Sequence, residues 1–116
     1  TDGRLPARRV LKQSPIMNLE EFERSTSKNA PPSGLSPMLE ALWFTRKGNW
    51  GRAHAIVQEH ENDTGSAPVH AHLHRVEGDL SNSGYWYRRA GRKPAKITLD
   101  EEWKALTAHF LEENEL

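Results

Sequence analysis

The chain contains no cysteine, so it has no disulfide framework, no thiolate zinc site and no thiol nucleophile. It also lacks an excess of either charge, because its 116 residues include 16 basic and 16 acidic side chains. General nucleic-acid binding and attachment to an anionic membrane surface are therefore not expected. Apolar runs are only a few residues long, whereas a membrane-spanning helix needs roughly 18, and no charged-then-apolar signal pattern opens the chain. These absences predict a soluble, cytoplasmic protein.

Signatures of catalysis and of β-structure are missing as well. The sequence has no glycine-rich phosphate loop, dinucleotide fingerprint, serine elbow or calcium loop. Strand-type alternation is nearly absent, whereas apolar residues recur at the three- and four-residue spacing of helices. The predicted fold class is therefore all-α, and no motif indicates a reaction type or a cofactor.

Turn-forming and capping residues divide the chain into two parts. Residues 1–34 are polar and rich in turn signals, which predicts an irregular N-terminal arm and linker with one short helix. Residues 35–116 predict a single helical domain, because a chain of this length makes about one domain. Predicted helix starts follow the capping residues Asn18, Ser36, Asn49, Asp79 and Thr98. We expect a small bundle of about five helices arranged as antiparallel hairpins.

The most specific stretch is residues 68–91, which reads PVHAHLHRVEGDLSNSGYWYRRAG. In a helix, His70, His74 and Glu77 fall at positions i, i+4 and i+7 and form one polar stripe. His72 points away from that stripe and is predicted to face solvent.

The spacing of nearby residues in the sequence predicts what surrounds this stripe. His54 and Gln58 share one stripe of the preceding helix, and an antiparallel arrangement would turn it toward the histidines. The expected core-facing residues on either side of Gly78 are Val69, Leu73, Val76, Leu80, Ser83, Gly84 and Tyr87. Trp43, Trp50 and Trp103 fit core stripes.

The histidines leave three interpretations open. They can hydrogen-bond neighbours and fix helix packing, bind a ligand, or hold a divalent metal, for which His54, His70, His74 and Glu77 are the candidate ligands. A histidine paired with Glu77 can also act as an acid or a base near neutral pH. The zinc-protease motif is excluded in its usual form, because Ala71 stands where that motif has its glutamate.

Arginines and aromatic residues surround the same stretch. Arg75, Arg88 and Arg89 suit a phosphate or carboxylate, although Arg75 or Arg88 can instead pair internally with Glu77 or Asp79. Trp86 lies near Asn82 and Arg89 on its helix and is the candidate surface residue for stacking on a flat ligand.

The run from Gly78-Asp79 to Tyr85-Trp86-Tyr87-Arg88-Arg89-Ala90-Gly91 resembles the second helix of a Sel1-type or tetratricopeptide-like repeat. The resemblance implies paired helices whose concave face binds a peptide or a protein partner. Residues 39–103 also resemble a family of small bacterial proteins with no assigned function, which implies no activity.

Together these patterns predict a protein- or ligand-binding module, with a small histidine-carboxylate enzyme and a divalent-metal-binding protein as alternatives. The expected partner is a protein or a small anionic ligand, and a homodimer is plausible. The candidate binding residues are His54, Gln58, His70, His74, Arg75, Glu77, Asn82, Trp86, Arg88 and Arg89.

Overall fold

The computed structural model describes residues 17–114, which form six α-helices and no strand. The all-α prediction is confirmed, while residues 1–16 of the arm predicted for residues 1–34 lie outside the described range. The helices are α1 (Leu19–Ser25), α2 (Pro37–Arg46), α3 (Trp50–Glu59), α4 (Ser66–Glu77), α5 (Leu80–Arg89) and α6 (Leu99–Asn114). None of these helices is both long enough and apolar enough to cross a membrane.

The predicted capping residues are where five of the helices begin. Asn18 and Thr98 each form a reciprocal capping box with a glutamate three residues later, at 2.8–3.0 Å. The side chains of Ser36, Asn49 and Asp79 each accept a hydrogen bond from a backbone amide three residues later. These caps involve residues three positions apart, so the helix starts are set by local sequence.

The start of α4 is different, because Gly65 precedes it without a side-chain cap. Gly65 has a φ of +89°, and a Cβ at this position would lie 2.7 Å from Cε1 of Phe110. Only glycine lets the backbone at the start of α4 approach α6 so closely.

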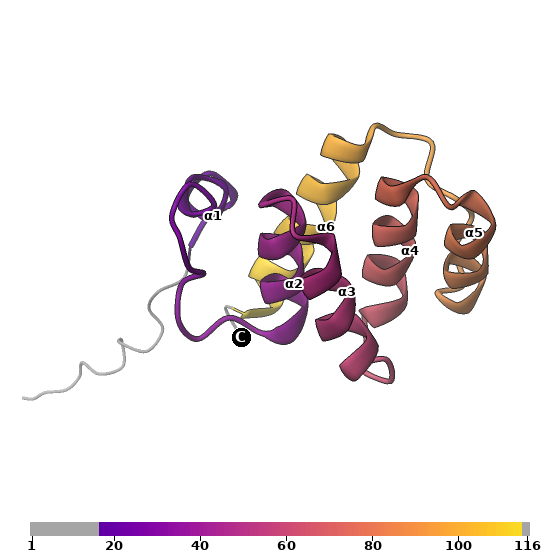
Figure 1. The fold of residues 1–116 in the computed structure, drawn as a ribbon, viewed down its shortest axis with the longest axis horizontal. Helices are drawn as coiled ribbons and strands as arrows, with labels where there is room; N and C mark the ends of the chain where they lie inside the picture. The colour runs from indigo at the N-terminus through magenta and orange to yellow at the C-terminus, as the bar shows by residue number, and fades with distance from the viewer. Residues whose placement is uncertain (1–16, 115–116) are drawn as a thin grey trace, which may run out of the picture.

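Two antiparallel hairpins, α2–α3 and α4–α5, form most of the domain. Figure 1 shows α1 to α5 following one another across the molecule, while α6 returns past α4 and α2 to reach α1. Phe22 of α1 is fully buried and its ring lies 6.0 Å from that of Trp103 in α6. The short helix of the predicted arm therefore packs into the same core as the rest.

The main core lies between α6 and the first hairpin. Leu39, Leu42 and Val57 are fully buried there, and Trp103 donates its indole N–H to the carbonyl of Leu42 at 2.8 Å. A smaller apolar cluster between α4 and α5 contains Trp86 and Tyr87.

Two of the predicted core positions are wrong. Val76 is 40% exposed and Leu80 is 70% exposed. Both flank Gly78 at the tip of the α4–α5 hairpin, where the neighbouring helices leave them partly uncovered. Ser83 and Tyr87, one and two turns into α5, are buried as predicted.

Candidate functional site

Three histidines from two adjacent helices converge in the α3–α4 interface. His54 comes from α3, and His70 and His74 come from successive turns of α4, which lies beside α3 (Figure 1). One ring nitrogen from each histidine lies within 4.8 Å of the other two. The Nε2 atoms of His54 and His70 are 3.1 Å apart. We call His54, His70 and His74 the three-histidine group.

Tryptophan rings hold two of these imidazoles in place. His54 stacks on Trp50 with ring centroids 4.6 Å apart and planes 10° from parallel, while His70 stacks on Trp86 at 3.8 Å and 13°. Trp50 is itself anchored, because its indole N–H donates to the carbonyl of Leu73 at 2.6 Å. Trp86 is only 8% exposed, so its prediction as a surface stacking residue is wrong: His70 already covers its ring.

The orientation of His74 is set by Glu77. The Nδ1 atom of His74 lies 2.6 Å from Oε1 of the Glu77 carboxylate, one helical turn later. Because the carboxylate oxygen accepts in this hydrogen bond, Nδ1 carries the donated hydrogen, and Nε2 is the ring nitrogen left for another partner. Glu77 thus orients one imidazole from outside the three-histidine group.

Burial lowers the pKa of two members of the group, His70 and His54. Burial, and then the neighbouring His54, His74 and Arg89, lower the pKa of His70 from 6.5 to about 4. Burial and His74 also lower the pKa of His54, against the opposing effect of Glu77. The Nδ1 atom of His70 is buried and has no hydrogen-bond partner among the described residues.

The other predicted binding residues do not join this group. Gln58, Asn82 and Arg88 are exposed on α3 and α5. Arg89 places its guanidinium 5.1 Å from the ring centroid of Trp86, on the helix that covers His70, and donates to the hydroxyl of Tyr85 at 3.2 Å.

A second polar cluster was not predicted, and it corrects the expectation that His72 faces solvent. His72 is 1% exposed, and its Nδ1 lies 2.7 Å from Oε1 of Glu102. Arg75 contacts the same oxygen through Nη1 at 2.7 Å, so its predicted pairing with Glu77 or Asp79 is wrong. The hydroxyl of Tyr87 donates to Oε2 of Glu102. α6 covers the side of α4 that carries His72, which a pattern within one helix does not reveal.

These contacts determine the charge of the Glu102 carboxylate. Burial alone would raise the pKa of Glu102, but hydrogen bonds from His72, Tyr87 and Arg75 outweigh it and lower the pKa to about 2. Burial and the Glu102 carboxylate raise the pKa of Tyr87 to about 12. Glu102 is therefore ionised and Tyr87 protonated at neutral pH.

One sequence signal points to this cluster. Glu102 lies three residues after Leu99 and four before Leu106, on the stripe that also carries Trp103 and Phe110. An acidic residue on a core-facing stripe needs a buried partner.

The fold and the site define a small all-α domain with a buried three-histidine group. No protein-family model matches the chain, and neither the curated proteins nor the solved structures include a match to it.

Proposed function

We propose that this domain binds a divalent transition-metal ion, with Zn²⁺ as the best fit, through His54, His70 and His74. The observation that carries the proposal is the convergence of three imidazole nitrogens within 4.8 Å. A tetrahedral zinc site with Zn–N distances of about 2.0–2.1 Å places its ligand nitrogens about 3.4 Å apart. The 3.1 Å separation in the His54–His70 pair is close to that value.

The protonation of the group favours a metal. A histidine binds a metal through the lone pair of a neutral ring, and the lowered pKa of His70 and of His54 keeps both rings neutral at pH 7. Metal binding at neutral pH then displaces few protons from these two rings.

The surroundings of the group also resemble those of metal ligands in general. Metal-binding histidines commonly donate their second ring N–H to a carboxylate, and Glu77 accepts such a bond from His74. The stacked Trp50 and Trp86 restrict rotation of His54 and His70, which lowers the entropy lost on binding. Three protein ligands would leave one tetrahedral position for water or a further ligand.

The competing interpretation is purely structural. A hydrogen bond between neutral His54 and His70 would join α3 to α4 without any ion. The two interpretations differ in one measurable respect, because only a metal site makes the stability of the domain depend on a metal in solution. The peptide-binding role implied by the Sel1-type resemblance stays a prediction.

The test is elemental analysis of the untagged protein, combined with thermal unfolding in the presence of Zn²⁺ or a chelator. We expect about one Zn²⁺ per chain and a higher Tm with Zn²⁺. His54→Ala, which changes the least buried member of the group, should abolish both effects. His109→Ala removes an exposed histidine from α6 and is the matched control.

A second variant covers the case in which His54→Ala alters folding. Glu77→Gln changes an exposed side chain and should weaken Zn²⁺ binding by about 10- to 100-fold, since it removes the carboxylate that orients His74. Protein that retains no metal and shows the same Tm with Zn²⁺ and with chelator would overturn the proposal.

A further inference from the structure

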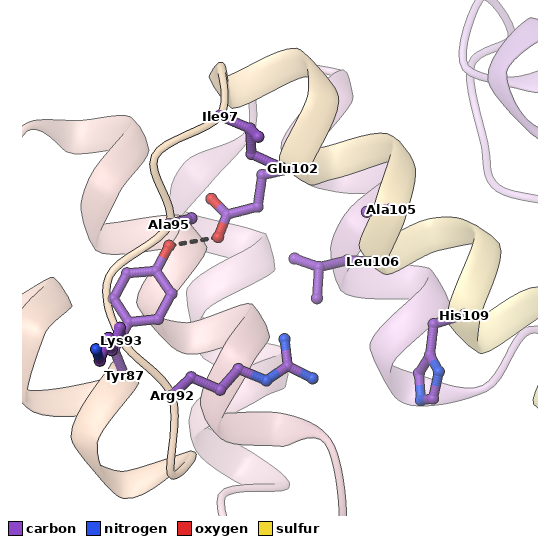
Figure 2. A pocket seen from close by; sticks show the side chains of 9 residues that line it. All are labelled: Tyr87, Arg92, Lys93, Ala95, Ile97, Glu102, Ala105, Leu106 and His109. Carbon is purple, nitrogen blue, oxygen red and sulfur yellow. Dashed lines mark hydrogen bonds between the residues drawn. The ribbon is translucent and has the colours of Figure 1, made fainter.

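A pocket of about 210 Å³ lies between α6 and the segment that connects α5 to α6. Figure 2 shows Tyr87 and Glu102 meeting at one side of this pocket, with Leu106 of α6 facing them and Arg92 extending from the connection. It involves none of the residues of the three-histidine group, so the inference below is independent of metal binding.

The charge of the pocket is positive. Glu102 is the acidic residue that lines it, but both of its oxygens are already occupied and Arg75 balances its charge. The cations Arg92 and Lys93 add two further positive charges to the lining. His109 lines the pocket too, and its Nε2 lies 3.1 Å from a carboxylate oxygen of Glu113.

Arg92 is the cation best placed to meet a ligand. In Figure 2 its side chain extends from the connection toward α6, and the guanidinium lies below Leu106. Among residues 17–114, the guanidinium makes neither an ion pair nor a hydrogen bond. Arginine pairs with carboxylates through two parallel N–H donors, and this guanidinium has its donors available.

The remaining surface of the pocket is mostly apolar. Leu106 and Ala105 of α6 form one wall, and Ala95 and Ile97 of the connection form another. Ile97 is 45% exposed, so part of its side chain is available to contact an apolar ligand.

The volume limits the size of the occupant. A protein cavity of about 150 Å³ holds a benzene molecule, whereas pockets for drug-sized ligands measure about 300–1,000 Å³. At about 210 Å³, this pocket has room for a benzene-sized body and one small polar group.

We propose that this pocket binds a small monocarboxylate with a benzene-sized apolar body. The carboxylate pairs with the guanidinium of Arg92, and Lys93 supports it through its charge. The apolar body packs against Leu106 and Ala105. The ionised Glu102 and its donors form a fixed polar wall that excludes a second anionic group.

Benzoate is a suitable probe, and benzyl alcohol is its neutral counterpart. An NMR titration of the ¹⁵N-labelled chain with each compound should give shifts grouped around the α5–α6 connection and the middle of α6. We expect benzoate to bind about tenfold more tightly than benzyl alcohol, which corresponds to about 1.4 kcal/mol.

Two variants test the assigned roles. Arg92→Gln should remove the preference for benzoate, whereas Lys96→Gln, an exposed lysine on the same connection that does not line the pocket, should keep it. Ala105→Phe fills the apolar wall and should abolish binding of both compounds.

Three results would overturn the proposal. The first is an absence of grouped shifts with benzoate. The second is equal binding of benzoate and benzyl alcohol, which would show that Arg92 does not pair with the carboxylate. The third is an equal loss with Arg92→Gln and Lys96→Gln, which would indicate general attraction to positive charge.

Discussion

The carboxylate of Glu102 joins three helices. It lies on α6, accepts hydrogen bonds from His72 and Arg75 of α4, and accepts another from Tyr87 of α5. A buried carboxylate is stable only if hydrogen-bond donors replace the water that it loses on burial. Leaving one of its oxygens without a donor costs more free energy than the hydrogen bond itself contributes. The donors are therefore individually important for stability.

Tyr87→Phe tests the contribution of one donor to stability, because it removes a single oxygen atom. The change leaves the ring in the core but removes the hydroxyl that donates to Glu102. Because the acceptor is charged, we expect the free energy of unfolding to fall by about 1.5–3 kcal/mol. Urea unfolding monitored by circular dichroism measures the change.

Tyr85→Phe is the matched control on the same helix. Tyr85 is 43% exposed and its hydroxyl accepts from Arg89 at the surface. Its loss should change stability by less than about 0.5 kcal/mol. Equal effects of the two substitutions would contradict the role given to Glu102.

Helical spacing was sufficient to predict the three-histidine group. His70 and His74 are one turn apart on α4, and an antiparallel hairpin brings His54 of α3 beside them. The position of His72 was not predictable in this way. Its environment depends on α6, whose Glu102 lies 30 residues further along the chain.

Helix starts were equally predictable, because capping is local. The start of α4 has no such signal, since Gly65 is needed for contact with Phe110, far away in sequence. Val76 and Leu80 show the opposite case, because helical periodicity identifies an inward-facing stripe but does not show which of its residues the neighbouring helices cover.

Gly65→Ala tests the contact between the start of α4 and α6. The substitution adds backbone strain at φ +89° and a Cβ that meets the ring of Phe110 at 2.7 Å. Gly48→Ala adds similar strain at φ +84° but its Cβ meets open space. Gly48→Ala should cost about 1 kcal/mol of stability, and Gly65→Ala should cost at least about 1 kcal/mol more.

Thermal and urea unfolding of the two variants provide the measurement. The difference between them isolates the steric contact, because both carry the backbone strain. If Gly65→Ala is as stable as Gly48→Ala, the start of α4 has room to move away from α6.

The molecule as a whole is closed by α6, which contacts α1, α2 and α4. The core places Trp103 against α1 and α2, and the Glu102 cluster connects α6 to α4 and α5. Since one helix carries both sets of contacts, losing the charge of Glu102 should affect unfolding of the entire domain.

Acid titration of stability tests this coupling. Glu102 has a folded-state pKa of about 2 against an ordinary value of 4.5, so the unfolded chain binds this proton more readily. The resulting stabilisation is fully present above about pH 4.5 and is lost as the pH falls through about 2. We therefore expect the urea midpoint to decrease with falling pH in this window.

Glu102→Gln should be less stable than the parent at pH 7, because an amide replaces the charged acceptor, and its stability should depend less on pH between 4.5 and 2. The pKa of Asp100 is also lowered, by hydrogen bonds from Arg46 and Lys104. Because Asp100 is present in both proteins, its contribution to the pH dependence of stability cancels when the two curves are compared. Parallel curves for the two proteins would show that the acid sensitivity of the domain originates elsewhere. Curves that converge toward low pH would instead assign it to the single carboxylate that joins α4, α5 and α6.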